Sequence, residues 1–337
     1  MALNPDTGVL PFTPLRDPEL QDLIRWCRNG AEGSPIRLLT GVAGIGKTRL
    51  LLEAADRLRP KGWACGWVRP RCAAAAVNAA EQRQRPALLI VDDADTVDDL
   101  PQLITALADC RPSPRIRVVL SARDFSDWWI AASGNLHPDV LAALPSSSEQ
   151  LHLASLNHTP RDLGQYFAQA VRHFARYFAV SVPANALDEA CSTASLSDIQ
   201  AAAAVAARSG FAGPVNLDAA LRELFTAEEE WWSAIAESEG LHYSAEMLNT
   251  AVVFAALVGA ESSAQCVRRL RVLPGFGSVP EDRLQKLAQV LRKLYPKHSD
   301  DWLDPHLPAR LMERYAVQRL LAHPPLPAAL SAAALTT

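Results

Sequence analysis

The chain lacks the features that a membrane or a secretory route would require. No stretch approaches the ~18–20 consecutive apolar residues of a membrane-spanning helix. The longest candidate, Ala251–Ala260, is about half that length and is typical of a helix in a protein core. Met1–Pro14 has no basic start followed by an apolar run, so the pattern of a secretory signal is missing. We therefore expect a cytoplasmic protein with no membrane partner.

Metal-binding and hydrolase spacings are missing as well. The six cysteines are scattered without a CxxC pair, which argues against a zinc site and predicts reduced thiols. The eight histidines include no HExxH motif, and no GxSxG motif occurs. The formal net charge of −4 gives no overall electrostatic reason to bind nucleic acid or anionic lipid. Nucleic acid is therefore not an expected partner.

The composition is that of a globular protein, with 49% hydrophobic and 21% charged residues. At ~100–200 residues per domain, the length of 337 residues predicts two or three domains. Apolar runs that alternate with helical patterns predict an α/β fold, in which right-handed βαβ units form a parallel sheet with helices on both faces. The expected strands are Ile36–Thr40, Trp63–Val68, Ala87–Asp92, Ile116–Ser121 and Gln150–Leu153.

Strand signals almost vanish after residue 155, and amphipathic helical patterns replace them. Thr159-Pro160 combines the capping hydroxyl and the first-turn proline of a helix start. The tail from Pro324 is rich in proline and alanine and is interpreted as a flexible linker. The further expected helices are Ser197–Arg208, Asn216–Ser238, Ser244–Leu257, Ser263–Leu270, Pro280–Leu294 and Arg310–Leu321.

One glycine-rich segment carries a phosphate-binding motif. Gly41–Thr48 fits G-x-x-x-x-G-K-[ST], in which glycines let the backbone N–H groups wrap around phosphate oxygens. Lys47 would place its charge on the β- and γ-phosphates, and Thr48 would offer its hydroxyl to Mg²⁺. The alternative is an accidental glycine-rich turn, against which the apolar run before the motif and the helical pattern after it both argue. The expected nucleotide contacts are Gly41, Val42, Ala43, Gly44, Ile45, Gly46, Lys47, Thr48 and Arg49.

Two adjacent acids follow the apolar run that starts at Ala87. An acid at this place can hold Mg²⁺ through the water shell of the ion, and a second can orient or deprotonate the attacking water. We assign Asp92 to Mg²⁺ and Asp93 to the catalytic base, with Asp95 as a competitor for the second role. The alternative is that these acids merely cap a strand end or a turn.

Two basic segments also have a possible role in binding. Arg123 follows the expected strand Ile116–Ser121, where it could sense or stabilise the charge of the γ-phosphate. The alternative is a surface arginine paired with Asp124 or Asp127. Arg268–Arg271 could contact nucleic acid, but a short basic run on an acidic chain is more typical of a solvated face.

Several segments together resemble the nucleotide-binding module of STAND ATPases, the signal-transduction ATPases related to the NB-ARC and NACHT groups. The similar proteins are bacterial, largely actinobacterial, members that continue into tetratricopeptide repeats. The resemblance covers roughly residues 10–325, and it is specific in the ATPase third and looser in the helical part. It rests on Phe12–Leu20, Gly41–Thr48, Gly62–Gly66, Leu88–Asp95 and Arg117–Arg123.

The resemblance implies an ATPase sheet, a small helical lid and a winged-helix domain that close around the nucleotide. It places Arg16 near the adenine side of the pocket and makes Arg123 the arginine that ends the fourth strand. Similar bacterial proteins often have tyrosine where Asp93 stands, which leaves the role of base open to Asp95. No Met-His-Asp motif is found, and His306 is the remaining candidate for a contact with the β-phosphate.

The sequence thus predicts an α/β P-loop domain followed by all-α parts. The expected boundaries are an N-terminal segment with a short helix (1–29), the ATPase domain (30–155), the lid (156–213), a winged-helix-like domain (214–325) and a flexible tail (326–337).

The expected function is an ATP/ADP- and Mg²⁺-dependent switch with slow ATP hydrolysis. The resemblance implies that ADP holds a monomer, that ATP permits homo-oligomers, and that the setting is signalling, for example in defence against phage. Three alternatives stay open: a transcription regulator that binds DNA through Arg268–Arg271, a kinase or motor with high turnover, and a scaffold that binds nucleotide without hydrolysing it. The trigger of the switch is not predicted.

Overall fold

The structure is a computed structural model. It describes residues 9–29, 34–69, 71–83, 85–110, 116–124, 128–129, 150–154, 160–181, 186–187, 195–210, 214–294, 302–303 and 309–336. The chain divides into two compact units. Unit 1 comprises Met1–Gln169 with Ser192–Leu196, and unit 2 comprises Ala170–Cys191 with Ser197–Thr337.

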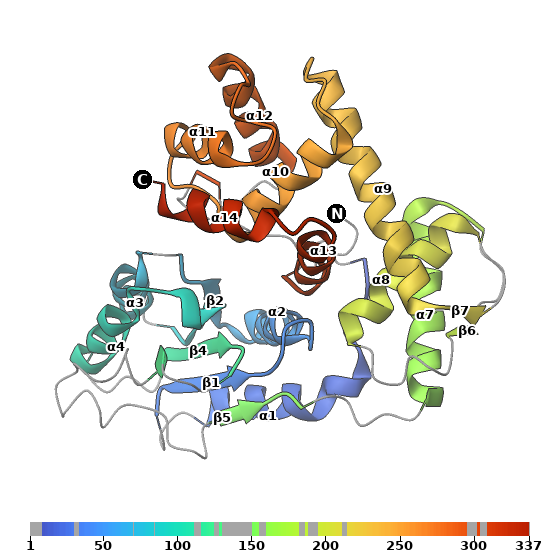
Figure 1. Cartoon of the computed structure of the whole chain (residues 1–337). Helices are drawn as coiled ribbons and strands as arrows, with labels where there is room; N and C mark the ends of the chain where they lie inside the picture. The colour runs from blue at the N-terminus through green and yellow to red at the C-terminus, as the bar shows by residue number, and fades with distance from the viewer. Residues whose placement is uncertain are drawn as a thin grey trace. The chain divides into compact units, whose positions relative to one another are not determined.

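Unit 1 is built on a parallel sheet of five strands in its described part, in the order β2-β3-β4-β1-β5 (Figure 1). Strand β4 therefore lies between β1, which leads into the glycine-rich loop, and β3, which leads into the acids. Thr40 at the end of β1 pairs with Ala122, and Val91 at the end of β3 pairs with Leu120. The strands are β1 (Ile36–Thr40), β2 (Ala64–Trp67), β3 (Ala87–Val91), β4 (Ile116–Ala122) and β5 (Gln150–His152).

Helices cover both faces of this sheet. Because strand side chains alternate, Leu39 and Val119 face α1 (Asp17–Arg28) and α2 (Lys47–Leu58), whereas their neighbours Leu38 and Leu120 face α3 (Ala73–Gln82) and α4 (Leu100–Asp109). Strands buried on both faces read as continuous apolar runs, which is why the sequence predicted them. Unit 1 also contains three short 3₁₀ turns, Pro14–Arg16, Arg59–Lys61 and Ala94–Thr96.

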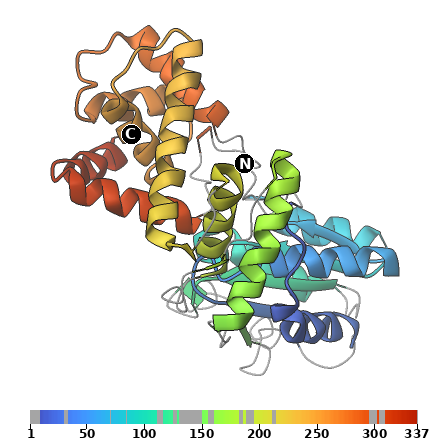
Figure 2. The same cartoon turned by 90° about the vertical axis from the view of Figure 1, so that its right-hand side faces the viewer.

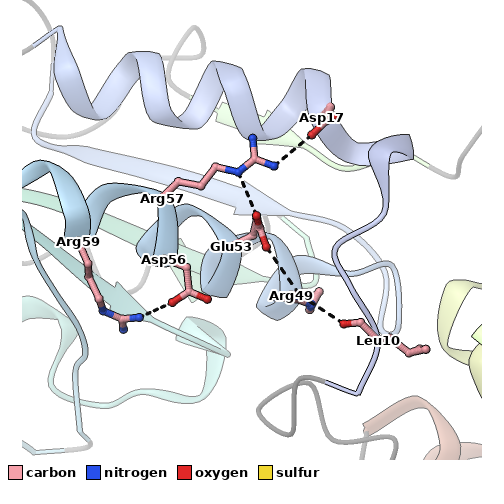
Figure 3. Close-up of polar contacts among 7 residues, drawn as sticks. All are labelled: Leu10, Asp17, Arg49, Glu53, Asp56, Arg57 and Arg59. Atoms are coloured by element: carbon pink, nitrogen blue, oxygen red, sulfur yellow. Dashed lines mark hydrogen bonds and ion pairs between the residues drawn. The ribbon is translucent and has the colours of Figure 1, made fainter. Parts of the chain in front are cut away.

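The N-terminal segment contacts charged side chains of α2 (Figure 3). The guanidinium groups of Arg49 and Arg57 lie 5.9 and 6.0 Å from the centre of the Phe12 ring. Glu53 lies between the two arginines on the same helix face, with its carboxylate 3.6 Å from Arg49 Nη2 and 3.0 Å from Arg57 Nε. Arg57 also pairs with Asp17 at 3.6 Å. This network ties the start of α1 to the helix that follows the glycine-rich loop.

The described part of unit 2 is almost entirely helical (Figure 2), and α7 has residues in both units. Side-chain caps explain several helix starts, because Asn216, Ser244 and Ser262 each accept a hydrogen bond from a backbone N–H three residues later. The helices are α7 (Pro160–Phe178), α8 (Leu196–Ser209), α9 (Leu217–Ser238), α10 (Ala245–Leu257), α11 (Ser263–Val272), α12 (Glu281–Leu294), α13 (Ala309–Ala322) and α14 (Leu326–Leu335).

An aromatic cluster joins α9 to α13 in the core of unit 2. The Tyr315 ring lies edge-on to Phe225 and Trp232, with centroid distances of 5.2 and 5.3 Å. The Tyr315 hydroxyl donates a 2.7 Å hydrogen bond to Glu229 Oε1. This hydrogen bond to a carboxylate links α9 and α13 beside the aromatic cluster.

Most of the expected architecture is confirmed: a parallel-sheet domain followed by a helical part. The expected flexible tail is wrong for Leu326–Leu335, which form α14, because Pro325 and Pro327 lie at a helix start that tolerates proline and the remaining residues are strong helix formers. Helix α3 was not expected. In the described part of 214–336, the only β pairing outside the short parallel pair Ala186–Leu187 with Pro214–Val215 is a bridge between Ala260 and Leu303.

The boundaries between a lid and a winged-helix-like domain stay predictions, and Thr159, Asp127 and His306 lie outside the described residues. Among the helices that the structure describes, none has both the length and the apolar character that crossing a bilayer requires.

The Tyr315–Glu229 hydrogen bond should contribute measurably to stability. We expect Tyr315→Phe to lower the free energy of unfolding by about 1–2 kcal/mol, because Glu229 loses a donor while the packing of the ring is kept. Tyr177→Phe is the matched control, since Tyr177 is exposed, and it should stay within about 0.5 kcal/mol of the wild type. Equal losses for the two variants in urea titrations would contradict this role.

Candidate nucleotide-binding site

The loop between β1 and α2 has the backbone conformation of a phosphate cradle. Gly44 and Gly46 have φ values of 75° and 104°, which residues with a Cβ atom rarely adopt. Gly46 is also the N-cap of α2. Gly41 is needed for space, because a Cβ at this position would lie 2.9 Å from the carbonyl oxygen of Leu153. The loop therefore ends in a helix N-terminus, where N–H groups and the helix dipole favour an anion.

Lys47 is held inside this loop. Its ammonium donates hydrogen bonds to the carbonyl oxygens of Gly41 at 2.6 Å and Val42 at 3.4 Å. Burial lowers the pKa of Lys47 below its usual value, and three nearby carboxylates act in the opposite direction, those of Asp93, Asp92 and Asp95. A largely desolvated cation beside these N–H groups is suited to binding a polyphosphate.

Thr48 and Asp92 meet across the sheet edge. The Thr48 hydroxyl donates a 2.8 Å hydrogen bond to Asp92 Oδ2, although the residues are 44 positions apart in the sequence. Asp92 Oδ1 is buried and has no hydrogen-bond partner among the described residues. A hydroxyl and an unsatisfied carboxylate oxygen are hard oxygen donors of the kind that Mg²⁺ prefers, so these two residues fit the ion.

The two candidate bases follow directly after Asp92. Asp93 is exposed and has a left-handed backbone with φ 48°, a strained conformation that turns the chain into the 3₁₀ turn Ala94–Thr96. Asp95 Oδ1 is buried without a hydrogen-bond partner in the described part of the chain. Both carboxylates act to raise the pKa of Lys47, and the choice between them as base stays open.

Arg123 comes to the same edge from the strand between the loop and the acids. Its carbonyl oxygen accepts a 3.1 Å hydrogen bond from Gly41 N–H, which ties the end of β4 to the start of the loop. Its side chain is exposed, and its charge contributes to lowering the pKa of Lys47. The structure brings Thr48 and Asp92 into contact and places Lys47 and Arg123 at the same edge of the sheet, and the roles assigned to these residues stay predictions.

The two other predicted arginines lie differently. Arg16 is 3% exposed and donates to the backbone carbonyl oxygens of Ala154 at 2.8 Å and Ile45 at 3.5 Å. The Arg49 guanidinium lies against Glu53 and the Leu10 carbonyl oxygen, in the network of Figure 3. That both arginines contact nucleotide stays a prediction, and their observed contacts are with the protein.

Sequence reasoning missed the contribution of β5. Leu153 lies against Gly41, Ala154 accepts from Arg16, and His152 Nδ1 lies 3.0 Å from the Thr40 hydroxyl. No motif marks this segment, because its backbone carbonyls rather than its side-chain types make two of the contacts. In the described part of the chain no group of three or more His, Cys, Asp or Glu residues could hold a metal ion.

The basic run Arg268–Arg271 has a structural partner. Arg269 donates to the carbonyl oxygens of Thr336, Gly259 and Ala334 at 2.9–3.2 Å, and thereby caps the end of α14. Arg271 lies 3.9 Å from Glu281. These contacts account for two of the three arginines without nucleic acid.

Three solved structures share a similar arrangement at low identity. They are the ORC1 protein of Aeropyrum pernix in complex with DNA (TM-score 0.43, 16% identity, 94% of this chain and 95% of that one) and the ORC2 protein of the same organism as ADPNP-ADP complexes (0.42, 16%, 93% and 95%). The third is NtrX of Brucella abortus in complex with ADP (0.42, 15%, 86% and 70%). With TM-scores below 0.5, the ligands named for these proteins remain properties of those proteins.

A family model gives the more specific result. No functionally curated protein matches the chain, but residues 16–136 match the model described as Novel STAND NTPase 5. This range contains the glycine-rich loop, the acids after β3 and the arginine after β4, which the structure brings to one edge of the sheet. The chain therefore carries a nucleotide-binding P-loop NTPase domain of the STAND type.

Proposed function

We propose that the protein is an ATP/ADP switch that hydrolyses ATP slowly and associates with copies of itself in the ATP state. The single observation that carries this proposal is the Thr48–Asp92 hydrogen bond beside Lys47. It joins the loop that would hold the triphosphate to the acid that would hold Mg²⁺. The oligomerisation and a setting in defence signalling rest on the family resemblance alone.

Each group at the sheet edge has a role in this proposal. Backbone N–H groups of the loop bind phosphate oxygens, and Lys47 moves from its carbonyl partners to the β- and γ-phosphates. Thr48 and Asp92 would hold Mg²⁺, which neutralises charge on the β- and γ-phosphate oxygens when it is bound. Asp93 or Asp95 orients and deprotonates the attacking water, and Arg123 stabilises the charge that develops on the γ-phosphate.

Helix α8 offers a physical route from the loop to unit 2. Its first residue, Leu196, belongs to unit 1, and its side chain lies 3.9 Å from where a Gly46 Cβ would be. Two residues later, Asp198 is fully buried and pairs with Arg314 of α13 at 3.1 Å. A nucleotide can change the arrangement of the units only by as much as its affinities for two arrangements differ. Helix α8 begins beside the loop and continues in unit 2, so we propose that the difference in nucleotide affinity arises through this helix.

Retention of nucleotide tests the site itself. We expect mass spectrometry to find ADP co-purifying with the wild type and none with Lys47→Ala, because the phosphates lose their only buried loop cation. Lys61→Ala, which removes an exposed lysine after α2, should keep ADP. An empty wild type that also fails to bind added ATP would contradict the proposal.

The Thr48–Asp92 pair should act on Mg²⁺ rather than on nucleotide alone. We expect Asp92→Asn to reduce the gain in ATP affinity that Mg²⁺ provides by about 10-fold or more, while affinity in EDTA changes little. Asp56→Asn is the control, since Asp56 is exposed and pairs with Arg59. Titrations of a fluorescent ATP analogue with and without Mg²⁺ measure both values. An equal Mg²⁺ effect in Asp92→Asn and wild type would exclude this role.

The Asp198–Arg314 pair should couple nucleotide exchange to unit 2. We expect Arg314→Ala to speed ADP release several-fold, because it removes the ion pair between a buried carboxylate of α8 and α13 and thereby loosens α8. Asp198→Ala combined with Arg314→Ala should restore part of the wild-type rate, since no charge stays buried. Arg222→Ala, at an exposed position of α9, serves as control. Stopped-flow release of a fluorescent ADP analogue that is identical in all four proteins would speak against the coupling.

A further inference from the structure

Arg16 connects three parts of unit 1 that are far apart in the sequence. One nitrogen, Nη2, lies 2.8 Å from the carbonyl oxygen of Ala154, just after β5, and 3.5 Å from that of Ile45 in the glycine-rich loop. The other, Nη1, donates to Glu19 Oε1 at 2.6 Å on α1. The guanidinium thus stands between the loop and the strand that flanks it.

The contact with Ile45 bears on where the loop points its N–H groups. The Ile45–Gly46 peptide is planar and trans, so its C=O and N–H point in opposite directions. A cation that attracts the Ile45 carbonyl on one side therefore turns the Gly46 N–H toward the other side. Gly46 has φ 104° and little steric restraint of its own, which makes an external anchor for this peptide useful.

The contact with Ala154 fixes the neighbouring wall. Leu153 N–H donates to the Thr40 carbonyl oxygen at 2.8 Å, and the Leu153 carbonyl oxygen lies against Gly41. By holding the next residue, Arg16 keeps both ends of the loop, Gly41 and Ile45, at fixed positions relative to β5. Only a planar guanidinium offers several donors in a rigid fork, which a lysine ammonium cannot reproduce.

From this geometry we infer that Arg16 is a positioning residue for the phosphate-binding loop, and that it does not contact the base of the nucleotide. This inference rests on the proposed ATP site and assigns Arg16 a place there that differs from the adenine side. The two terminal nitrogens of the guanidinium bond two main-chain oxygens and one carboxylate, all within unit 1, and Nε is buried without a hydrogen-bond partner among the described residues. Its removal should therefore weaken whatever the loop binds, with or without an adenine.

Comparing two ligands tests this directly. Affinities of wild type, Arg16→Lys and Arg59→Lys are measured for ATP and for inorganic tripolyphosphate, which has no base. We expect Arg16→Lys to weaken both ligands by the same factor, about tenfold, since one anchor of the loop is lost in both cases. Arg59→Lys, whose arginine is exposed and pairs only with Asp56 among the described contacts, should match the wild type.

Two results would overturn the inference: a loss for ATP alone, which would mean a contact with the base, or no loss for either ligand. If Arg16→Lys does not fold, as judged by circular dichroism, Glu19→Gln takes its place. That variant removes only the ion pair that orients the guanidinium, and it should show a smaller but again equal loss for the two ligands. A wild type that binds neither ligand would instead contradict the proposed function.

Discussion

The proposed nucleotide-binding site depends on one contact, the hydrogen bond from Thr48 to Asp92 at the carboxyl edge of the parallel sheet. The sheet places β4 between β1 and β3, so the glycine-rich loop after β1 and the acids after β3 leave the same edge of the sheet, on either side of the end of β4. A parallel sheet collects the ends of all its strands at one edge, and the strand order decides which ends are neighbours. The chemistry of the site is thus a consequence of topology as much as of the motif.

Buried charged side chains are the second feature of the structure, and they show which residues are better explained by ligand binding than by stability. Lys47, Arg16 and Asp198 are each less than a tenth exposed. An apolar side chain of similar volume would often be as stable or more stable at such a position, so these charges cost stability unless a partner compensates them. Arg16 and Asp198 have protein partners of opposite charge, whereas Lys47 has only two carbonyl oxygens as direct partners in the described contacts. The lysine is therefore the charge that gains most from a bound anion.

Sequence patterns predicted the elements whose structure is determined by residues close together in the chain. Gly41–Thr48 and the apolar strands were readable because spacing alone encodes a glycine cradle and burial on both faces. Helix α3 was not predicted, because a run of alanines shows no alternation of apolar and polar residues. In addition, the N–H of Ala73 at its start donates a hydrogen bond to the carboxylate of Asp99, which is 26 residues later in the sequence. Helix α14 was predicted to be a linker because the segment is rich in proline, but its prolines lie at the helix start, where proline is tolerated. The contact of Arg16 with Ala154 could not be predicted, because the residues are 138 positions apart and the acceptor is a backbone carbonyl oxygen, which every residue has.

The central claim is that Thr48 and Asp92 hold a metal ion bound to the triphosphate. The most direct measurement replaces Mg²⁺ with Mn²⁺ and records electron–nuclear double resonance of the protein with ATP. We expect couplings to two phosphorus nuclei in an environment distinct from that of Mn²⁺ and ATP in buffer, and we expect Thr48→Ala to change the signal. A spectrum identical to that of Mn²⁺ and ATP in buffer would contradict the claim.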